Sequence, residues 1–298
     1  MLGASGFVGR HVLDVAAART AEVTAVGRHD RRGDRSGRWM TGDLAEASFA
    51  RSLVGEVRPD VIINCAGVTS GSVEAMEQGN VTVVRNVLDA MREASAPPRL
   101  VHLGSAVEYG AVERRMPMDE SSPARPTGRY GESKAAATAL VLGAPFADRM
   151  TVLRLFNVVG GGAPRSSLLG SAIVKIRAAQ AGDAGEIRLG DLSSHRDFVH
   201  VADVADAIVA AASATHIGGL VLNVGSGVAT RSRDLIRLLA SVAGFAGEIV
   251  EVASAGPHGG HVPWQQADIS RAAALLDWRP AHTLQDAVRD AWEASAAG

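Results

Sequence analysis

The 298-residue chain has one cysteine, few lysines, little net charge and no long apolar run. The lone Cys65 excludes an internal disulfide and favours a reducing, cytoplasmic compartment. A net charge of −2 gives no general attraction to nucleic acid or to a membrane, and no signal-peptide pattern is present. The nine histidines are scattered without metal-ligand spacing. We therefore predict no partner among nucleic acids or membranes, and no metal site.

Strand and helix patterns alternate along the chain. Residues 61–64 form a continuous apolar run, which is typical of a strand buried on both faces. An amphipathic helix follows over residues 81–91, and a second strand over residues 100–103. This alternation predicts an α/β fold, a Rossmann-like doubly wound parallel sheet with a smaller C-terminal substrate lobe.

A glycine-rich loop opens the chain, with Gly3, Gly6 and Gly9 at intervals of three before an amphipathic helix. Such a loop permits a tight turn and brings the backbone close to a pyrophosphate at the helix N-terminus. A simple turn is the alternative. Only Met1 and Leu2 precede Gly3, whereas a strand of about five residues is normal. We therefore expect either a shortened first strand or a start upstream of this numbering.

Tyr130 and Lys134 are four residues apart, so they share one face of a predicted helix. A free tyrosine has a pKa of about 10, and a neighbouring ammonium lowers it. Such a pair exchanges protons with a carbonyl or alcohol oxygen. Ser105 ends a predicted buried strand, where its hydroxyl could bind the same oxygen. The alternative is that Tyr130 and Lys134 are merely solvated helix residues.

Together these motifs resemble the extended short-chain dehydrogenases/reductases, in the nucleotide-sugar epimerase/dehydratase/reductase branch. The resemblance is carried by the segments GASGFVG, SAVEYG and YGESK, and it extends over nearly the whole chain. It implies that Ser105, Tyr130 and Lys134 are catalytic and that Asn80 orients the lysine through water. It implies further that the cofactor is bound by Gly3, Ser5, Gly6, Phe7, Val8, Gly9, Arg28, Asp43, Leu44, Cys65, Ala66, Gly67, Asn80, Tyr130, Lys134 and Leu155.

The cofactor preference is suggested at Arg28, which ends the predicted second strand. Relatives that prefer NAD carry an acidic residue near this point, whereas an arginine suits the 2′-phosphate of NADP. Asp30 lies close by, and the five arginines from Arg28 through Arg38 are also consistent with a solvated loop. We expect NADP(H), with NAD(H) as the alternative.

The resemblance places the nucleotide sugar beside two further segments, RLFN at residues 154–157 and RDFVHV at residues 196–201. Arg165 is a candidate ligand for a phosphate of the nucleotide, and the alternative is that it is simply an exposed arginine at the start of a helix. Relatives also carry a phosphate-binding arginine where this chain has His258 to Pro263, which leaves that contact to other arginines. The predicted substrate contacts are Val107, Glu108, Asn157, Arg165, Arg196 and Arg231.

The expected domain division places residues 1–157 and 191–224 in the NAD(P)-binding domain. Residues 158–190 and 225–298 then form the substrate lobe. The resemblance also implies a homodimer formed through a four-helix bundle, while burial of the same helices within one chain is the alternative.

For the reaction, the resemblance favours NADPH-dependent reduction of a 4-keto-(deoxy)sugar nucleotide to the hydroxy sugar. Dehydratases of this branch carry acidic residues where this chain has Ala106 and Val107. An NAD-dependent nucleotide-sugar 4-epimerase is the alternative. A non-catalytic NADP-binding regulatory protein ranks last, because Ser105, Tyr130 and Lys134 are all kept.

Overall fold

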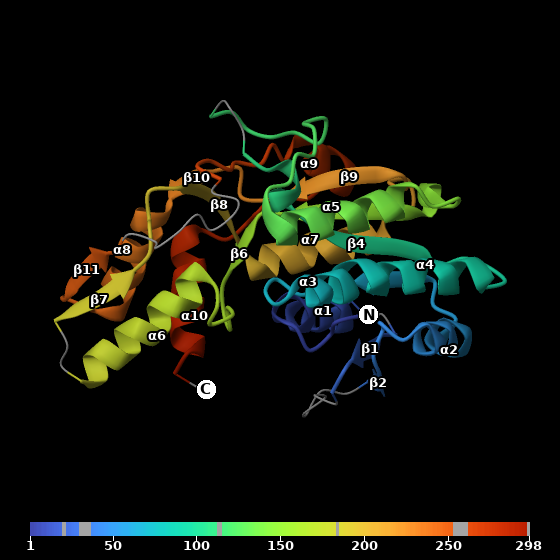
Figure 1. The fold of residues 1–298 in the computed structure, drawn as a ribbon, viewed down its shortest axis with the longest axis horizontal. Helices are drawn as coiled ribbons and strands as arrows, with labels where there is room; N and C mark the ends of the chain where they lie inside the picture. Colours follow the sequence, from blue (N-terminus) through green and yellow to red (C-terminus); the bar gives the residue numbers. More distant parts are fainter. Residues whose placement is uncertain (20–21, 30–36, 112–114, 183–184, 253–261, 297–298) are drawn as a thin grey trace.

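A computed structural model of the chain describes residues 1–19, 22–29, 37–111, 115–182, 185–252 and 262–296. These residues form a larger α/β part and a smaller lobe, which lie side by side in Figure 1. The predicted fold class, a Rossmann-like parallel sheet with a smaller substrate lobe, is confirmed.

The larger part is built on a parallel sheet whose strands are bounded as follows: β1 (Thr24–Gly27), β2 (Arg38–Thr41), β3 (Val61–Asn64), β4 (Arg99–Ser105), β5 (Met150–Leu155) and β9 (Leu220–Val224). Hydrogen bonding orders them as β2-β1 and β3-β4-β5-β9, all parallel. Parallel strands need helical crossovers that cover both faces. One face packs on α2 (Ala47–Val57), α4 (Val83–Glu93) and α5 (Gly128–Leu142), the other on α1 (Phe7–Ala18) and α7 (Val201–Ser213).

Short helices and turns connect these elements. α3 (Val73–Met76) continues through a π-helical turn, η1 (Glu77–Thr82), into α4. A 3₁₀ turn, η2 (Ala106–Tyr109), follows β4 directly, and a second one, η3 (Ala147–Arg149), precedes β5.

Met1 and Leu2 occupy the position of a first strand between β1 and β3. The Leu2 amide donates to the Ile63 carbonyl (2.9 Å), and the Leu2 carbonyl accepts from the Cys65 amide (3.1 Å). On the other side, the Val26 amide donates to the Met1 carbonyl (2.8 Å). The two-residue link joins β1-β2 to the rest of the sheet, and a cavity of about 480 Å³ lies beside it. Met1 and Leu2 therefore lie where the first strand of the sheet is expected.

The smaller lobe combines two small sheets with three helices. One sheet has the order β10-β8-β6, and the other pairs β11 with β7. Their core is made by buried residues of α6, α8 and α10 together with Ile187, Leu189 and Leu192. The element bounds are β6 (Asn157–Val159), α6 (Leu168–Ala181), β7 (Glu186–Leu189), β8 (His195–His200), β10 (Ala229–Arg231), α8 (Ser232–Ala243), β11 (Glu248–Glu251) and α10 (Leu284–Ala294).

Two elements differ from the expected domain division. β8, which we placed in the NAD(P)-binding domain, hydrogen-bonds to β6 and β10 of the lobe. Conversely, α9 (Ser270–Leu276) and Trp278, which we placed in the lobe, pack into the apolar cluster of α1 and α7. The chain therefore crosses between the two parts more often than the sequence suggested.

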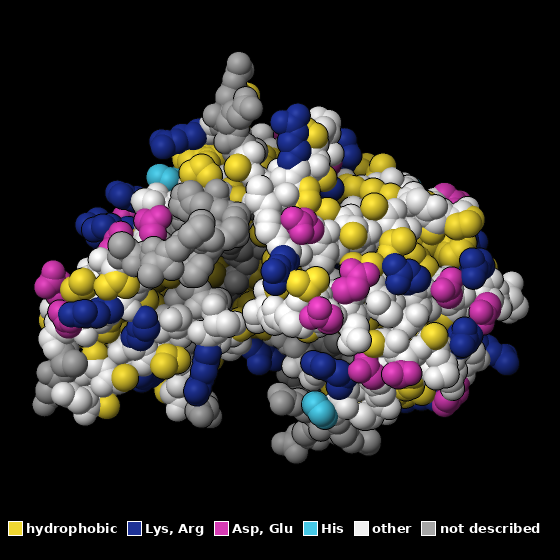
Figure 2. All heavy atoms as spheres, in the orientation of Figure 1, with side chains coloured by type: hydrophobic (Ala, Val, Ile, Leu, Met, Phe, Trp, Pro, Cys, Tyr) yellow, Lys and Arg dark blue, Asp and Glu magenta, His cyan; other side chains and the backbone are white. Residues whose placement is uncertain are grey.

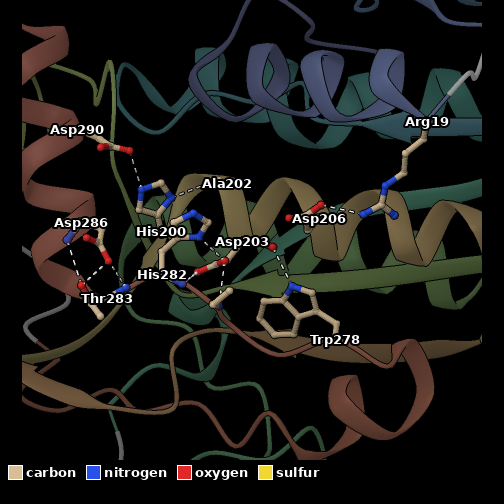
Figure 3. A network of polar contacts seen from close by, with 11 residues as sticks. Arg19, His200, Ala202, Asp203, Asp206, Trp278, His282, Thr283, Asp286 and Asp290 are labelled. Atoms are coloured by element: carbon tan, nitrogen blue, oxygen red, sulfur yellow. Dashed lines mark hydrogen bonds and ion pairs between the residues drawn. The ribbon is translucent and has the colours of Figure 1, made fainter.

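The C-terminal segment is tied to α7 by a polar network centred on Asp203, shown in Figure 3. The Asp203 side chain is 2% exposed and accepts from the amides of Ala281 (3.0 Å) and His282 (3.1 Å) and from His282 Nδ1 (2.7 Å). The His282 ring stacks on His200 at a centroid distance of 4.3 Å. His200 Nδ1 accepts the Ala202 amide, so its proton lies on Nε2, which donates to Asp290 of α10 (3.0 Å).

This network predicts a pH dependence of stability. The hydrogen bond to Asp203 raises the pKa of His282 above its usual value. A histidine whose pKa is higher in the folded than in the unfolded protein stabilises the fold. This stabilisation is complete below the pKa of the unfolded state, about 6.5, and is lost as the pH rises through the pKa of the folded state. We expect urea unfolding to show a larger advantage of wild type over His282→Gln at about pH 6 than at about pH 9. An advantage that grows with pH would contradict this coupling.

Acidic and basic side chains are mixed over the face seen in Figure 2. The outward residues of α5 include the small or apolar Ala136, Ala139 and Leu142, which is the surface that the expected four-helix bundle would use. The homodimer stays a prediction. Among the described residues, the structure contains no helix with the length and apolarity needed to span a bilayer; the cytoplasmic location also stays a prediction.

Candidate active site

The glycine loop between Leu2 and α1 has the close backbone approach that its spacing predicts. Gly3 has φ of +70°, in the left-handed region that favours glycine, and a Cβ there would lie 2.6 Å from the Ala66 nitrogen. A Cβ on Gly9 would lie 2.2 Å from the Gly3 carbonyl oxygen. Gly6 is the N-cap of α1, so the loop delivers the chain to a helix N-terminus. The residues fit a pyrophosphate at this turn.

A cavity of about 290 Å³ opens beside this loop at the carboxyl ends of β1 and β3. This edge of the sheet is where doubly wound folds bind dinucleotides. The structure brings together here nine residues that we predicted to bind the cofactor: Gly3, Ser5, Gly6, Arg28, Asp43, Leu44, Cys65, Ala66 and Gly67.

Other predicted cofactor residues do not line this cavity. Phe7, Val8 and Gly9 form the first turn of α1. The Leu155 side chain is buried in the apolar cluster with α1 and α7, so its predicted cofactor contact is not supported for the side chain. Its position in a sheet strand explains this, because alternate side chains of β5 point to opposite faces.

Ser105 and Tyr130 meet where β4 ends and α5 begins. The Ser105 hydroxyl hydrogen-bonds to the phenolic oxygen of Tyr130. The approach is close because Gly131 packs against η2, where a Cβ would lie 3.0 Å from the Val107 carbonyl oxygen. Burial raises the pKa of Tyr130, the Ser105 hydrogen bond lowers it, and the charge of Glu108 raises it. This corrects our expectation of a lowered pKa, because desolvation of the phenolate outweighs the Ser105 hydrogen bond and the charge of Glu108 adds to the rise.

Lys134 lies one turn after Tyr130 and is 5% exposed. Its Nζ donates to the Leu103 carbonyl oxygen of β4. Burial lowers the pKa of Lys134 to about 8, while the charge of Glu108 and, less strongly, Cys65 raise it. The ammonium is thus held beside the end of β4, at the Leu103 carbonyl, two residues before Ser105.

Asn80 lies close to α5, and its predicted role of orienting Lys134 through water stays a prediction. It is buried in the π-helical turn η1, and its amide both donates to the Val68 carbonyl and accepts from the Val68 amide (2.9 Å each). It also donates to Ser133 Oγ (2.9 Å), which in turn donates to the Tyr130 carbonyl oxygen (2.9 Å). These bonds hold α5 in place through Ser133. π-helical turns often mark functional sites.

The predicted substrate residues are spread over the lobe side. Asn157 Nδ2 donates to the Asp197 carbonyl (3.1 Å) and to Gln265 (3.3 Å), and Arg165 is exposed just before α6. Arg196 pairs with Thr230 across β8 and β10, and Arg231 pairs with His195. Because paired residues share a face and neighbours alternate, Arg196 and Arg231 leave the sheet on opposite faces. The strand register therefore does not place these two arginines together.

Glu108, which we predicted to contact the substrate, is buried inside the protein. Its side chain is 0% exposed, and its carboxylate accepts from the Ser105 amide (2.8 Å) and pairs with Arg154 Nε (2.9 Å). Arg154 was assigned to the sugar side through its motif, yet its guanidinium lies 4.5 Å from the Tyr109 ring centroid, inside the protein. Sequence reasoning missed this pair because the two residues are 46 positions apart.

Comparisons with known proteins agree with this geometry. The model of the NAD dependent epimerase/dehydratase family matches residues 1–225. The chain is 39% identical to dTDP-6-deoxy-L-talose 4-dehydrogenase (NAD(P)(+)) of Kitasatospora kifunensis, over 99% of this chain and 94% of that one. It is 32% identical to GDP-6-deoxy-D-mannose reductase of Pseudomonas aeruginosa, over 84% and 81% respectively. A structure of RMD from Pseudomonas aeruginosa complexed with NADPH superposes with a TM-score of 0.84 at 28% identity, covering 99% of this chain and 97% of that one.

Proposed function

Because the chain belongs to the NAD dependent epimerase/dehydratase family, we propose that it catalyses the NADPH-dependent reduction of a 4-keto-6-deoxyhexose nucleotide to the hydroxy sugar. The observation that carries the proposal is the convergence of Ser105, Tyr130 and Lys134 at the end of β4. Two relatives whose names specify oxidation or reduction of 6-deoxyhexose nucleotides support the substrate class. The higher identity of the dTDP-sugar enzyme favours a dTDP sugar over a GDP sugar.

The cofactor is held by the glycine turn, Asp43, Leu44 and the loop after β3, which line the cavity beside α1. When bound there, the reduced nicotinamide supplies a hydride to the carbonyl carbon. Tyr130 donates its phenolic proton to the carbonyl oxygen, so that the ketone becomes an alcohol. A raised pKa keeps Tyr130 protonated at neutral pH, as a proton donor must be. Ser105 orients the phenol, and the Lys134 ammonium stabilises the phenolate that remains.

Arg28 provides a test of the cofactor preference, since it lines the cavity beyond β1. Loss of a hydrogen bond to a charged group costs about 1.5 kcal/mol or more, which corresponds to about tenfold in affinity. We expect Arg28→Ala to raise the KM for NADPH at least about tenfold and to leave the KM for NADH within about twofold, because NADH lacks the 2′-phosphate.

The matched control is Arg38→Ala, which removes an arginine at the opposite end of the β1–β2 pair that forms an ion pair with Glu56 on the surface. It should leave both KM values unchanged. An equal loss for NADPH and NADH in Arg28→Ala would contradict recognition of the 2′-phosphate.

The function itself is tested by incubating the protein with NADPH and a panel of dTDP- and GDP-4-keto-6-deoxyhexoses. Stoichiometric oxidation of NADPH together with formation of the hydroxy sugar supports the reductase. Interconversion of 4-hydroxy epimers without net cofactor oxidation would instead identify the epimerase alternative. Cofactor binding with no turnover on any panel member would favour the non-catalytic alternative.

A further inference from the structure

We propose that Glu108 is a positioning residue for this centre: its buried carboxylate fixes Ser105 and supplies the negative charge that keeps Lys134 an ammonium. The inference rests on the proposed reductase function for its kinetic consequence. Its structural basis is the environment of one carboxylate behind the active site.

The carboxylate of Glu108 determines the turn that follows β4. One oxygen accepts from the Ser105 amide (2.8 Å), while Ser105 Oγ accepts from the Val107 amide (3.4 Å). This reciprocal pair is a capping box, which fixes the first residue of a helical turn. Gly104 leaves room for it, because a Cβ there would lie 2.7 Å from Glu108 Oε1. The orientation of Ser105 therefore depends on Glu108.

The second carboxylate oxygen is held by Arg154 on β5. The Oε2–Nε distance is 2.9 Å, and the two side chains are 0% and 7% exposed. Arg154 is itself held against the Tyr109 ring, 4.5 Å from its centroid. A buried pair of this kind is weak evidence of a contribution to stability, because desolvation offsets the attraction. Its position points instead to a role at the neighbouring site.

Lys134 and Glu108 both bind the end of β4, because Lys134 Nζ donates to the Leu103 carbonyl oxygen and the Glu108 carboxylate accepts from the Ser105 amide (2.8 Å). The titratable groups facing Lys134 are Glu108 from η2, Cys65 after β3, His102 from β4 and Tyr130 one turn earlier on α5. Burial raises the pKa of Cys65 to about 12 and lowers the pKa of His102 well below its usual value, so both are uncharged at neutral pH. Tyr130 is also uncharged there. Glu108 is thus the source of negative charge among these groups, and it opposes the loss of the Lys134 proton on burial.

The chain offers an unusually direct test, because it contains two lysines, Lys134 and the exposed Lys175. Carbon-13 labelling at lysine Cε would give two NMR signals whose pH titration reports each pKa without any substrate. Glu108→Gln keeps an oxygen for the Ser105 amide and removes the charge. We expect the pKa of Lys134 to fall by about one unit and that of Lys175 to stay constant. An unchanged pKa of Lys134 would overturn the inference.

Two further variants separate charge from folding. Glu108→Gln/Arg154→Met removes both charges, so no unpaired guanidinium stays buried. It should show a fall in the pKa of Lys134 no larger than that of Glu108→Gln, with a higher free energy of unfolding than Glu108→Gln. Glu120→Gln is the control, since Glu120 is a buried carboxylate (3% exposed) that bonds the Asn223 amide and Arg271. It should leave the pKa of Lys134 unchanged.

The kinetic readout is the pH profile of kcat/KM for ketone reduction. The alkaline limb should move to lower pH in both Glu108 variants by the same amount as the NMR titration. If kcat/KM fell by the same factor at every pH and the alkaline limb did not move, the role of Glu108 would be merely structural and the inference would be overturned. If wild type shows no reduction, the proposed function fails, while the NMR titration still decides the role of Glu108.

Discussion

Tyr130→Phe should lower kcat for ketone reduction by about a thousandfold, because the variant lacks the proton donor. The phenylalanine ring fills the same partly buried space as the tyrosine ring, so the fold should persist. The affinity for NADPH should change by no more than about twofold, since the cavity that holds the nucleotide is lined by other residues. Steady-state kinetics and cofactor titration of the same preparation measure both quantities.

The chain provides a matched control, because its only other tyrosine is Tyr109. Tyr109 is 2% exposed and donates its hydroxyl hydrogen bond to Asn223 (2.7 Å). Tyr109→Phe should cost about 1 kcal/mol of stability and leave kcat within about threefold of wild type. If Tyr130→Phe kept more than a tenth of the wild-type kcat, the proton would have to come from another group.

The parts of the site that the sequence predicted are those fixed by local backbone geometry. The glycine loop needs a positive φ at Gly3 and a missing Cβ at Gly9, and both requirements are visible in the spacing of glycines. The Tyr130–Lys134 pair follows in the same way from helical periodicity. The large parallel sheet was predictable because buried strands read as continuous apolar runs.

Side-chain direction and long-range pairing were not predictable from the sequence. Glu108 lies in a loop next to Ser105, so a substrate contact was a reasonable interpretation, but its carboxylate turns inward to Arg154. The raised pKa of Tyr130 depends on how deeply the fold buries the phenol. Arg196 and Arg231 each suit a phosphate, yet their faces are set by the pairing of β8 with β10. These features depend on tertiary contacts that no local pattern records.

The return of the C-terminal segment to the larger part was missed for the same reason. Trp278 donates its indole N–H to the Asp203 carbonyl oxygen (2.9 Å), and its ring lies in the apolar cluster with α1 and α7. The sequence marks Asp203 as a residue at the start of α7, where an acidic side chain is commonplace. It gives no sign that the partners of this carboxylate come from residues 281 and 282.

Asp203→Ala should lower the free energy of unfolding by about 3 kcal/mol, at about 1 kcal/mol for each of three lost hydrogen bonds. The three bonds join the buried carboxylate to the Ala281 amide, the His282 amide and the His282 ring. Without them, the segment between α9 and α10 loses its polar attachment to α7, although Trp278 still packs beneath it. Urea unfolding followed by tryptophan fluorescence measures the change.

Asp206→Ala is the control for this prediction, because Asp206 lies one turn further along the same helix (Figure 3). Its ion pair with Arg19 (2.9 Å) joins side chains that are 42% and 51% exposed. Solvent-exposed pairs contribute less than about 1 kcal/mol, so the two variants should differ by about 2 kcal/mol or more. If both variants lost the same free energy of unfolding, removal of either carboxylate from α7 would destabilise the protein equally. Asp203 would then not specifically attach the C-terminal segment.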